Sequence, residues 1–155
     1  MESESAITEA LRRSLGSTLE PLIFEVERGA IRRFAEAVGD PNPLYYDEEH
    51  ARQAGYGGVI APPGFFGWPV DGMPAIEDVL EAFHCPFKRV LNGGTDCEFY
   101  RPVQAGDVLT ATRRLVDISE REGSLGRMLI LVIETRYVNQ DDELVAVNQD
   151  ATIAL

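Results

Sequence analysis

Residues 128–138 read MLILVIETRYV, and this strongly apolar stretch decides the fold. It is too long and too rich in Ile and Val for a loop, and it predicts a strand. Three further stretches of strand character accompany it: 95–100, 108–118 and 144–153. Turn residues separate the four stretches, at 104–107, 122–124 and 139–142. Consecutive strands joined by short turns predict an antiparallel sheet.

The first half of the chain is predicted to be mainly helical. Apolar residues recur at helical spacing in three stretches: 7–15, 31–38 and 75–83. Asp47 is a suitable N-cap for a short helix that ends at Ala54, and Gly39 is a suitable C-cap for the helix before it. Residues 22–26 are predicted to be a short strand, and Pro63 fits the first turn of a further helix. Helices followed by antiparallel strands indicate an α+β domain, with the sheet wrapped around a buried helix.

Composition excludes several classes of protein. The chain has 155 residues, the size of one domain, and 26 acidic against 14 basic residues give a formal charge of −12. This balance argues against a nucleic-acid partner and against anionic membranes, since both need clustered positive charge. The longest apolar run is far below a membrane span, and the acidic N-terminus does not resemble a signal peptide. With only Cys85 and Cys97, we expect a reducing, cytoplasmic location.

The loop at residues 39–44, GDPNPL, is the first candidate for chemistry. Two prolines within three residues fix two φ angles, so we expect no regular structure from Asp40 to Asp47. A rigid loop directly after a helix can hold the Asp40 carboxylate in a fixed direction. An ordinary helix end and turn explains the same residues, because Asp and Asn are common in turns.

Residues 59–64, VIAPPG, form the second candidate. If a helix begins there, its free N–H groups can stabilise an oxyanion, for instance on a thioester carbonyl. Gly64 has no side chain and so allows close approach of a ligand. A stiff turn that feeds a core helix is the competing interpretation. His84, Cys85 and Cys97 lack a fourth ligand, so we expect neither a metal site nor a cofactor.

Five short motifs in their order along the chain resemble one known family. They are GDPNPL (39–44), GY (55–56), IAPP (60–63), FYRP (99–102) and AGD (105–107). Over most of the chain the sequence resembles the MaoC-like hotdog-fold acyl-thioester dehydratases and hydratases, and more specifically their N-terminal, FAS1-like dehydratase subgroup. The resemblance implies a single hotdog domain at 21–155, preceded by an N-terminal helical extension at 1–20.

The resemblance also implies site residues. In active members the first motif is followed at once by a His, which works with the Asp on a 2-enoyl or 3-hydroxyacyl thioester. Asp40 matches the Asp, but the His position holds Tyr45, whose usual pKa near 10 makes it a poor base at neutral pH. Asp40 and Tyr45 are therefore the catalytic candidates. The implied substrate-binding candidates are Asn42, Tyr56, Gly64 and Phe65.

Three functional hypotheses follow. The first is a subunit that binds an acyl-CoA or acyl-carrier-protein thioester and pairs with a catalytic hotdog partner, as a homodimer or a heterodimer. The second is a self-sufficient hydratase that uses Asp40 and Tyr45. The third is a non-enzymatic binding module that reuses the fold. Because thioester carriers are anionic, we expect a local basic patch from Arg32, Arg33, Lys88, Arg89 and Arg101, although ordinary solvated charges explain them too.

Overall fold

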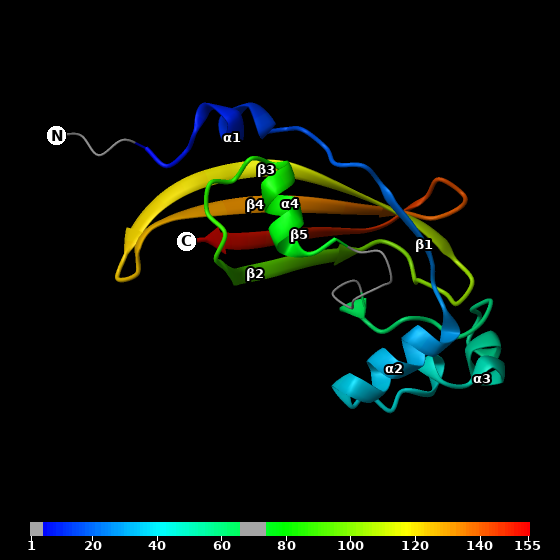
Figure 1. Cartoon of the computed structure of the whole chain (residues 1–155). Coiled ribbons are helices and arrows are strands. Elements are labelled where there is room, and N and C mark those ends of the chain that lie inside the picture. Colours follow the sequence, from blue (N-terminus) through cyan, green and yellow to red (C-terminus); the bar gives the residue numbers. More distant parts are fainter. Residues whose placement is uncertain (1–4, 66–73) are drawn as a thin grey trace.

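The computed structural model describes residues 5–65 and 74–155, and its centre is one curved antiparallel sheet (Figure 1). The strands of this described part are β1 (Leu22–Glu25), β2 (Val90–Phe99), β3 (Val108–Gly123), β4 (Gly126–Val138) and β5 (Leu144–Ala154). Their order across the sheet is β1-β3-β4-β5-β2. β2 is thus an edge strand beside the last strand of the chain, while consecutive hairpins join β3, β4 and β5.

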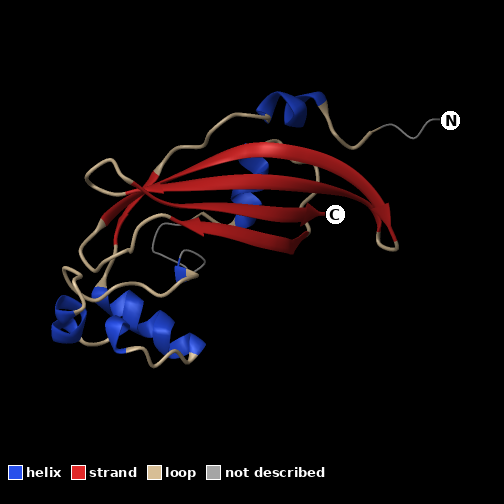
Figure 2. Cartoon of the chain, turned by 180° about the vertical axis from the view of Figure 1, so that it is seen from behind, coloured by secondary structure: helices blue, strands red, loops and turns tan. Residues whose placement is uncertain are grey.

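The described helices lie in three places around the sheet. They are α1 (Glu9–Ser14), α2 (Arg28–Val38), α3 (Glu48–Gln53) and α4 (Ile76–Ala82), with a single 3₁₀ turn, η1, at Pro43–Tyr45. Figures 1 and 2 show α4 on one face of the sheet, α1 beside its β3 edge, and α2 and α3 beyond one of its ends. The predicted α+β class is therefore confirmed.

Two apolar clusters hold these layers together. In the first, Ile31 and Phe34 of α2 pack with residues that include Val59 and Phe65 and with the nearest ends of the strands. In the second, Phe83 and the apolar side of α4 pack on Leu131 and its neighbours in β3, β4 and β5. Phe83 is fully buried, and burying such a side chain contributes about 1.5–3 kcal/mol. The side chains over the middle of the sheet, between the two clusters, belong to neither cluster.

Strands β2 to β5 are longer than the sequence pattern predicted, whereas β1 is one residue shorter than the predicted 22–26. β3 runs on to Gly123 because the hairpin to β4 closes through Ser124 and Leu125 alone. Gly126 has a φ of 93°, which an L side chain adopts only with strain. β2 begins at Val90, five residues before the expected start, and continues through a register shift between Asn92 and Gly94. A bulge interrupts the period-2 pattern on which the expected boundary depended.

The expectation of no regular structure between Asp40 and Asp47 is wrong at one turn. Pro43–Tyr45 forms η1, because Pro at the first helical position loses no needed donor, and Asn42 caps it by accepting the Leu44 N–H at 3.1 Å. The predicted caps are confirmed: Gly39 ends α2 with a φ of 70°, and Asp47 accepts the His50 N–H at 3.0 Å.

The helix expected from Pro63 onward falls largely on residues 66–73, outside the described residues. Within the described part, Pro62 to Phe65 form a turn, closed by the Phe65 N–H donating to the Pro62 carbonyl at 3.2 Å. None of the helices found in residues 5–65 and 74–155 is both long enough and apolar enough to cross a bilayer.

Candidate active site at the convergence of three loops

Three segments far apart in sequence meet at the α2 end of the sheet. The Ile60 N–H donates to the Leu44 carbonyl at 3.1 Å, which joins the 39–44 loop to the 59–64 segment. The Ala61 N–H donates to the Val103 carbonyl at 2.7 Å, and the Ala105 N–H donates to the Val59 carbonyl at 3.0 Å. Backbone hydrogen bonds therefore bring three segments, 39–44, 59–64 and 103–105, to one place.

The Asp40 carboxylate supports its own loop. One of its oxygens accepts the Asn42 N–H at 3.0 Å, and the Tyr46 hydroxyl donates to the Asp40 backbone carbonyl at 2.8 Å. Asp40 is half-buried at the end of α2. The loop is thus held in one conformation by hydrogen bonds on both sides, as the prolines predict.

Tyr45 lies inside the first apolar cluster, with 7% of its surface exposed. Burial raises the pKa of its phenol, and the negative charge of Asp40 raises the pKa further, against a smaller opposite effect of Asn42. Tyr56 also raises it, so these four predicted site residues lie close enough to interact electrostatically. A phenol with a raised pKa remains protonated at neutral pH, so the Tyr45 hydroxyl is suited to donating a hydrogen bond and poorly suited to accepting a proton.

A cavity of about 330 Å³ opens beside Tyr45, and we call it the motif cavity. Its lining comes from the converging loops: Tyr45, Ile60, Ala61, Pro62, Pro63, Phe65 and residues 99–103. Phe65 is buried there and stands edge-on to Phe34, with 5.9 Å between the ring centroids. Of the predicted site residues, Tyr45 and Phe65 line this cavity, whereas Asp40, Asn42 and Tyr56 are not among the described residues that line it.

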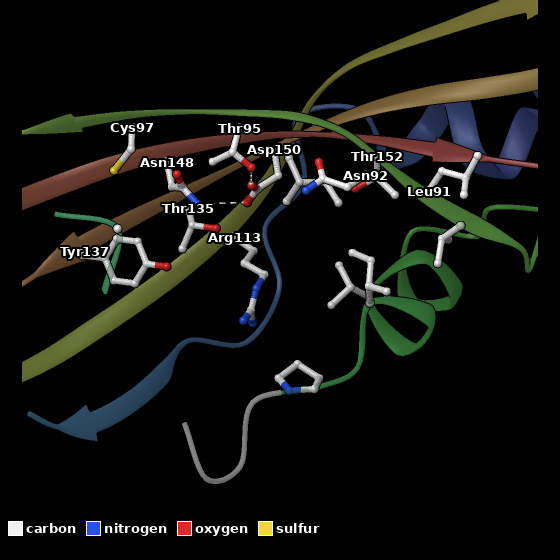
Figure 3. Close-up of a pocket in the computed structure, with 16 residues that line it drawn as sticks. Leu91, Asn92, Thr95, Cys97, Arg113, Thr135, Tyr137, Asn148, Asp150 and Thr152 are labelled. Atoms are coloured by element: carbon white, nitrogen blue, oxygen red, sulfur yellow. Dashed lines mark hydrogen bonds between the residues drawn. The ribbon is translucent and has the colours of Figure 1, made fainter. Parts of the chain in front are cut away.

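Gly64 lines a second and larger cavity. This cavity, of about 500 Å³, lies between α4 and the middle of the sheet, and we call it the sheet cavity (Figure 3). Gly64 has a φ of 88°, and a Cβ there would meet the Phe34 ring at 3.7 Å, so the turn needs glycine for its backbone conformation. The turn at Pro62–Phe65 therefore has Pro63 and Phe65 on one cavity and Gly64 on the other.

The floor of the sheet cavity is polar because the strand register aligns polar residues across the sheet. Arg113 pairs with Thr135, Thr135 pairs with Asn148, and Asn148 pairs with Cys97, so one row crosses four strands. In the next row Asp150 pairs with Thr95. We call Thr95, Arg113, Thr135, Asn148 and Asp150 the polar belt.

Two donors hold the Asp150 carboxylate of the belt. The Thr95 hydroxyl donates to one of its oxygens at 2.6 Å, and the Asn148 amide donates to the other at 3.1 Å (Figure 3). Tyr137 borders the belt in the neighbouring row. Burial raises its pKa strongly, and the charge of Arg113 opposes this, which places the guanidinium near the phenol.

The polar belt was not among the predicted site residues. Its signal was present in the strand alternation. Arg113 stands between Ala111 and Leu115, and Thr135 stands between Ile133 and Tyr137, at positions where period 2 requires inward-facing apolar residues. A polar residue at an inward position of two adjacent strands is the pattern that points to such a belt.

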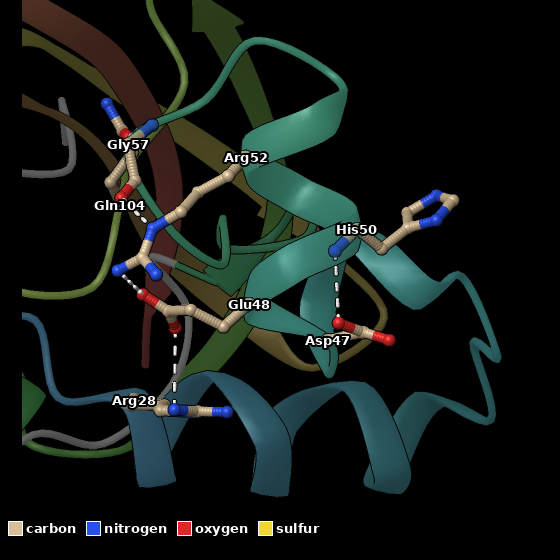
Figure 4. A network of polar contacts seen from close by, with 7 residues as sticks. All are labelled: Arg28, Asp47, Glu48, His50, Arg52, Gly57 and Gln104. Carbon is tan, nitrogen blue, oxygen red and sulfur yellow. Dashed lines mark hydrogen bonds and ion pairs between the residues drawn. The ribbon is translucent and has the colours of Figure 1, made fainter.

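A surface network fixes α3 beside the motif loops (Figure 4). Glu48 pairs with Arg28 of α2 at 3.4 Å and with Arg52 at 2.9 Å. Arg52 reaches the Gly57 carbonyl at 3.5 Å, and the Gly57 N–H donates to the Gln104 side chain at 2.6 Å. The network thus connects α2, α3 and the loop before β3.

His50 does not belong to that network. Figure 4 shows its ring pointing away from the other residues drawn, and the residue is exposed. Within residues 5–65 and 74–155, no group of three His, Cys, Asp or Glu side chains could hold a metal ion.

The expected basic patch does not form as one surface. Arg32 pairs with Glu36 on α2 at 2.9 Å, and Arg101 pairs with Glu143 at 2.9 Å. Lys88–Arg89 precede β2 and Arg101 follows it, and a strand of 10 residues spans about 30 Å. These charges therefore lie on separate parts of the surface.

The family model described as "FAS1-like, dehydratase domain region" matches residues 13–148 of the chain. A UPF0336 protein from Thermobifida fusca (strain YX) is 42% identical over 119 residues, which cover 73% of this chain and 75% of the relative.

Two solved structures are similar over nearly the whole chain. The first is a HadBC (3R-hydroxyacyl-ACP dehydratase) complex from Mycobacterium tuberculosis, with a TM-score of 0.73 and 28% identity over 91% of this chain and 97% of the other. The second is the ChsH1-ChsH2 complex from the same organism, with a TM-score of 0.76 and 21% identity over 95% and 94%. The latter likeness concerns the fold alone.

Proposed function

Because the chain belongs to the FAS1-like dehydratase family, whose fold is the hotdog fold of hydratases and dehydratases, we propose that it binds an acyl thioester of CoA or acyl carrier protein. We further propose that it is the substrate-binding, non-catalytic half of a 3-hydroxyacyl-thioester dehydratase or 2-enoyl-thioester hydratase. A second hotdog unit then supplies the catalytic base.

The environment of Tyr45 carries this proposal. Addition or removal of water on an enoyl thioester needs a group that exchanges a proton near neutral pH. The family resemblance places a His at this position, and this chain places a buried phenol there with a raised pKa. Asp40 is retained, but it is engaged in its own loop. Such a site is suited to binding and poorly suited to proton transfer.

The two cavities suggest how the thioester lies. The motif cavity is formed by the loops of the family motifs, and we assign the thioester end to it. The sheet cavity lies on the other side of the Pro62–Phe65 turn and extends over the middle of the sheet. We assign the acyl chain to the sheet cavity, because its volume of about 500 Å³ is within the range of small-molecule sites.

The free edge of β2 is the proposed contact with a second hotdog unit. An unpaired edge strand offers backbone groups to another chain, and native proteins normally cover it. Apolar side chains are exposed along or just after this strand: Leu91 at 49%, Phe99 at 45% and Tyr100 at 54%. Phe99 and Tyr100 also line the motif cavity, so a partner seated here would adjoin the proposed thioester site.

The partner is either a second copy or a different hotdog protein. The two solved structures described above are complexes of differently named subunits, HadBC and ChsH1-ChsH2. We propose the reducing cytoplasm as the compartment, which the free thiols of Cys85 and Cys97 support.

The test is hydration of crotonyl-CoA by the purified chain, alone and mixed with a hotdog protein that retains the Asp and His pair. In this assay we expect no turnover of crotonyl-CoA by the chain alone and turnover in the mixture with the partner. Calorimetry with octanoyl-CoA tests binding separately, and we expect the chain to bind it. Tyr45→Phe should leave binding within about twofold, the size of a weak or absent hydrogen bond, and His50→Ala is the control, because the exposed His50 ring points away from its neighbours.

Two results would contradict the proposal. Turnover by the chain alone that disappears in Asp40→Ala and Tyr45→Phe, but persists in the control His50→Ala, would establish a self-sufficient hydratase. Absence of binding to any acyl-CoA would instead identify a module that reuses the fold without its ligand.

A further inference from the structure

The polar belt includes a charged side chain, Arg113, at a position of the sheet whose neighbours belong to the apolar core. Arg113 is 9% exposed and lies between the two apolar clusters. In residues 5–65 and 74–155, no ion pair or hydrogen bond to its guanidinium is found, although its charge acts on Tyr137. The buried part of Arg113 is therefore its aliphatic stem, and the guanidinium keeps its donors available to a partner from the adjoining space.

The guanidinium has access to the sheet cavity. Figure 3 shows Arg113 extending from β3 into the space between the sheet and α4. No buried side-chain nitrogen or oxygen of the described residues lacks a hydrogen-bond partner, so the guanidinium donors are open to the cavity rather than enclosed by protein. The arginine is therefore available to a ligand.

The carboxylate of the belt is differently placed. Asp150 already accepts hydrogen bonds from Thr95 and Asn148. It stands two strands away from Arg113, about 10 Å at the usual strand spacing. Arg113 and Asp150 bring opposite formal charges to one cavity floor, so the belt has no net formal charge.

The wall opposite the belt is apolar. Ile76 and Val79 of α4 line it, together with Leu91 of β2. A ligand in this cavity therefore has hydrocarbon contacts on one side and hydrogen-bonding groups on the other. A chain with an oxygen function along or at the end of an alkyl segment matches both surfaces.

On these grounds, and resting on the proposed function, we propose that the sheet cavity selects acyl thioesters whose chain carries a neutral oxygen group, a hydroxyl or a ketone, distant from the thioester. Arg113 donates to that oxygen, while the alkyl part packs on α4. An unsubstituted alkyl chain displaces water from Arg113 and gives it no acceptor. A carboxylate also gains Arg113, but it has to give up the hydration of its own charge, which a neutral oxygen does not, and it leaves the belt with a net negative charge together with Asp150.

The test compares matched CoA thioesters by calorimetry on the full chain, in complex with its partner if one is needed for binding. Hexanoyl, octanoyl and decanoyl chains are measured unsubstituted, with a terminal hydroxyl, with a ketone beside the terminal methyl group, and with a terminal carboxylate. We expect the best neutral oxygenated chain to bind about tenfold more tightly than its unsubstituted match, the usual effect of a hydrogen bond to a buried charge.

Arg113→Met should abolish or invert that preference, because it keeps an unbranched apolar stem and removes the guanidinium donors. Arg136→Met is the matched control, since Arg136 follows Thr135 on the opposite, exposed face of β4. If Arg113→Met does not fold, the ligand series on the natural sequence still decides the matter.

Equal binding of alkyl and oxygenated chains by the natural sequence would overturn the inference while leaving the proposed function intact. Tightest binding of the carboxylate chains would also overturn it, because Asp150 would then not oppose a second anion. Failure of every chain to bind would overturn the proposed function and this inference with it.

Discussion

Alanine is expected to have opposite effects at the two ends of α2, which carries Asp40 into the motif loop. Gly29 is the second residue of this helix, and Gly39 follows its last residue with a φ of 70° and a ψ of 26°. We expect Gly29→Ala to raise the free energy of unfolding and Gly39→Ala to lower it. The two glycines are ten positions apart in the same local structure, so the pair isolates backbone conformation from composition.

The structure sets the magnitude of each effect. A Cβ on Gly39 meets no atom within 4 Å, so the cost of Gly39→Ala is conformational alone, about 1–2 kcal/mol for an L residue in the left-handed region. A Cβ on Gly29 approaches only the end of the Arg33 side chain, at 3.1 Å, and this flexible group can move. Gly29→Ala should then gain about 0.4–1 kcal/mol through a less flexible unfolded chain.

Urea unfolding followed by far-ultraviolet circular dichroism measures both differences. Gly39→Asn serves as a further control, because Asn tolerates the left-handed region better than Ala does and should cost less. A stabilising or neutral Gly39→Ala, or an equal loss from Ala and Asn, would refute the conformational argument. A loss from Gly29→Ala as large as that from Gly39→Ala would refute the explanation based on φ.

Three further predictions concern the core, the alkaline pH dependence and the surface. Phe83→Ala should cost about 3–5 kcal/mol in urea unfolding, because the fully buried ring leaves a cavity under α4. Burial raises the pKa of Tyr137 in the folded state. The protonated phenol therefore contributes fully to stability below its unfolded pKa of about 10, and this contribution is lost as the pH rises through the folded pKa. Tyr137→Phe should flatten that alkaline decline of the melting temperature in thermal scans. Arg101→Ala should lower the free energy of unfolding in urea by less than about 1 kcal/mol despite the 2.9 Å pair with Glu143, because both side chains are substantially exposed. A larger loss would mean that the ion pair has a structural role.

Much of the fold could be predicted from local patterns. The apolar stretches at 108–118, 128–138 and 144–153 give three adjacent strands because hairpins with polar turns join them. The pairing of strands that are far apart in the sequence was harder to predict from these patterns. β2 lies at the far edge beside β5, and its bulge at Asn92–Gly94 hides the start of the strand from any period-2 reading.

The candidate site could be predicted only in part. The motif loops carry their own signal, since prolines, caps and turns act locally, whereas their meeting at one place is a finding of the structure. The roles of Asp40, Tyr45, Asn42, Tyr56, Gly64 and Phe65 remain predictions. The polar belt depends on register across four strands, and one strand alone shows Arg113 only as an isolated exception.

The turn at Pro62–Phe65 depends on both local sequence and long-range packing. Its sequence is local, and its conformation depends on Gly64 at a φ of 88°. Its position is set by two long-range contacts: the Ala61 N–H donates to the Val103 carbonyl, and the Phe65 ring packs edge-on against Phe34. Because this turn contributes lining to both cavities, a change in its backbone would alter both together. Loss of thioester binding and loss of acyl-chain selection should therefore be coupled at Gly64 and separable at Arg113.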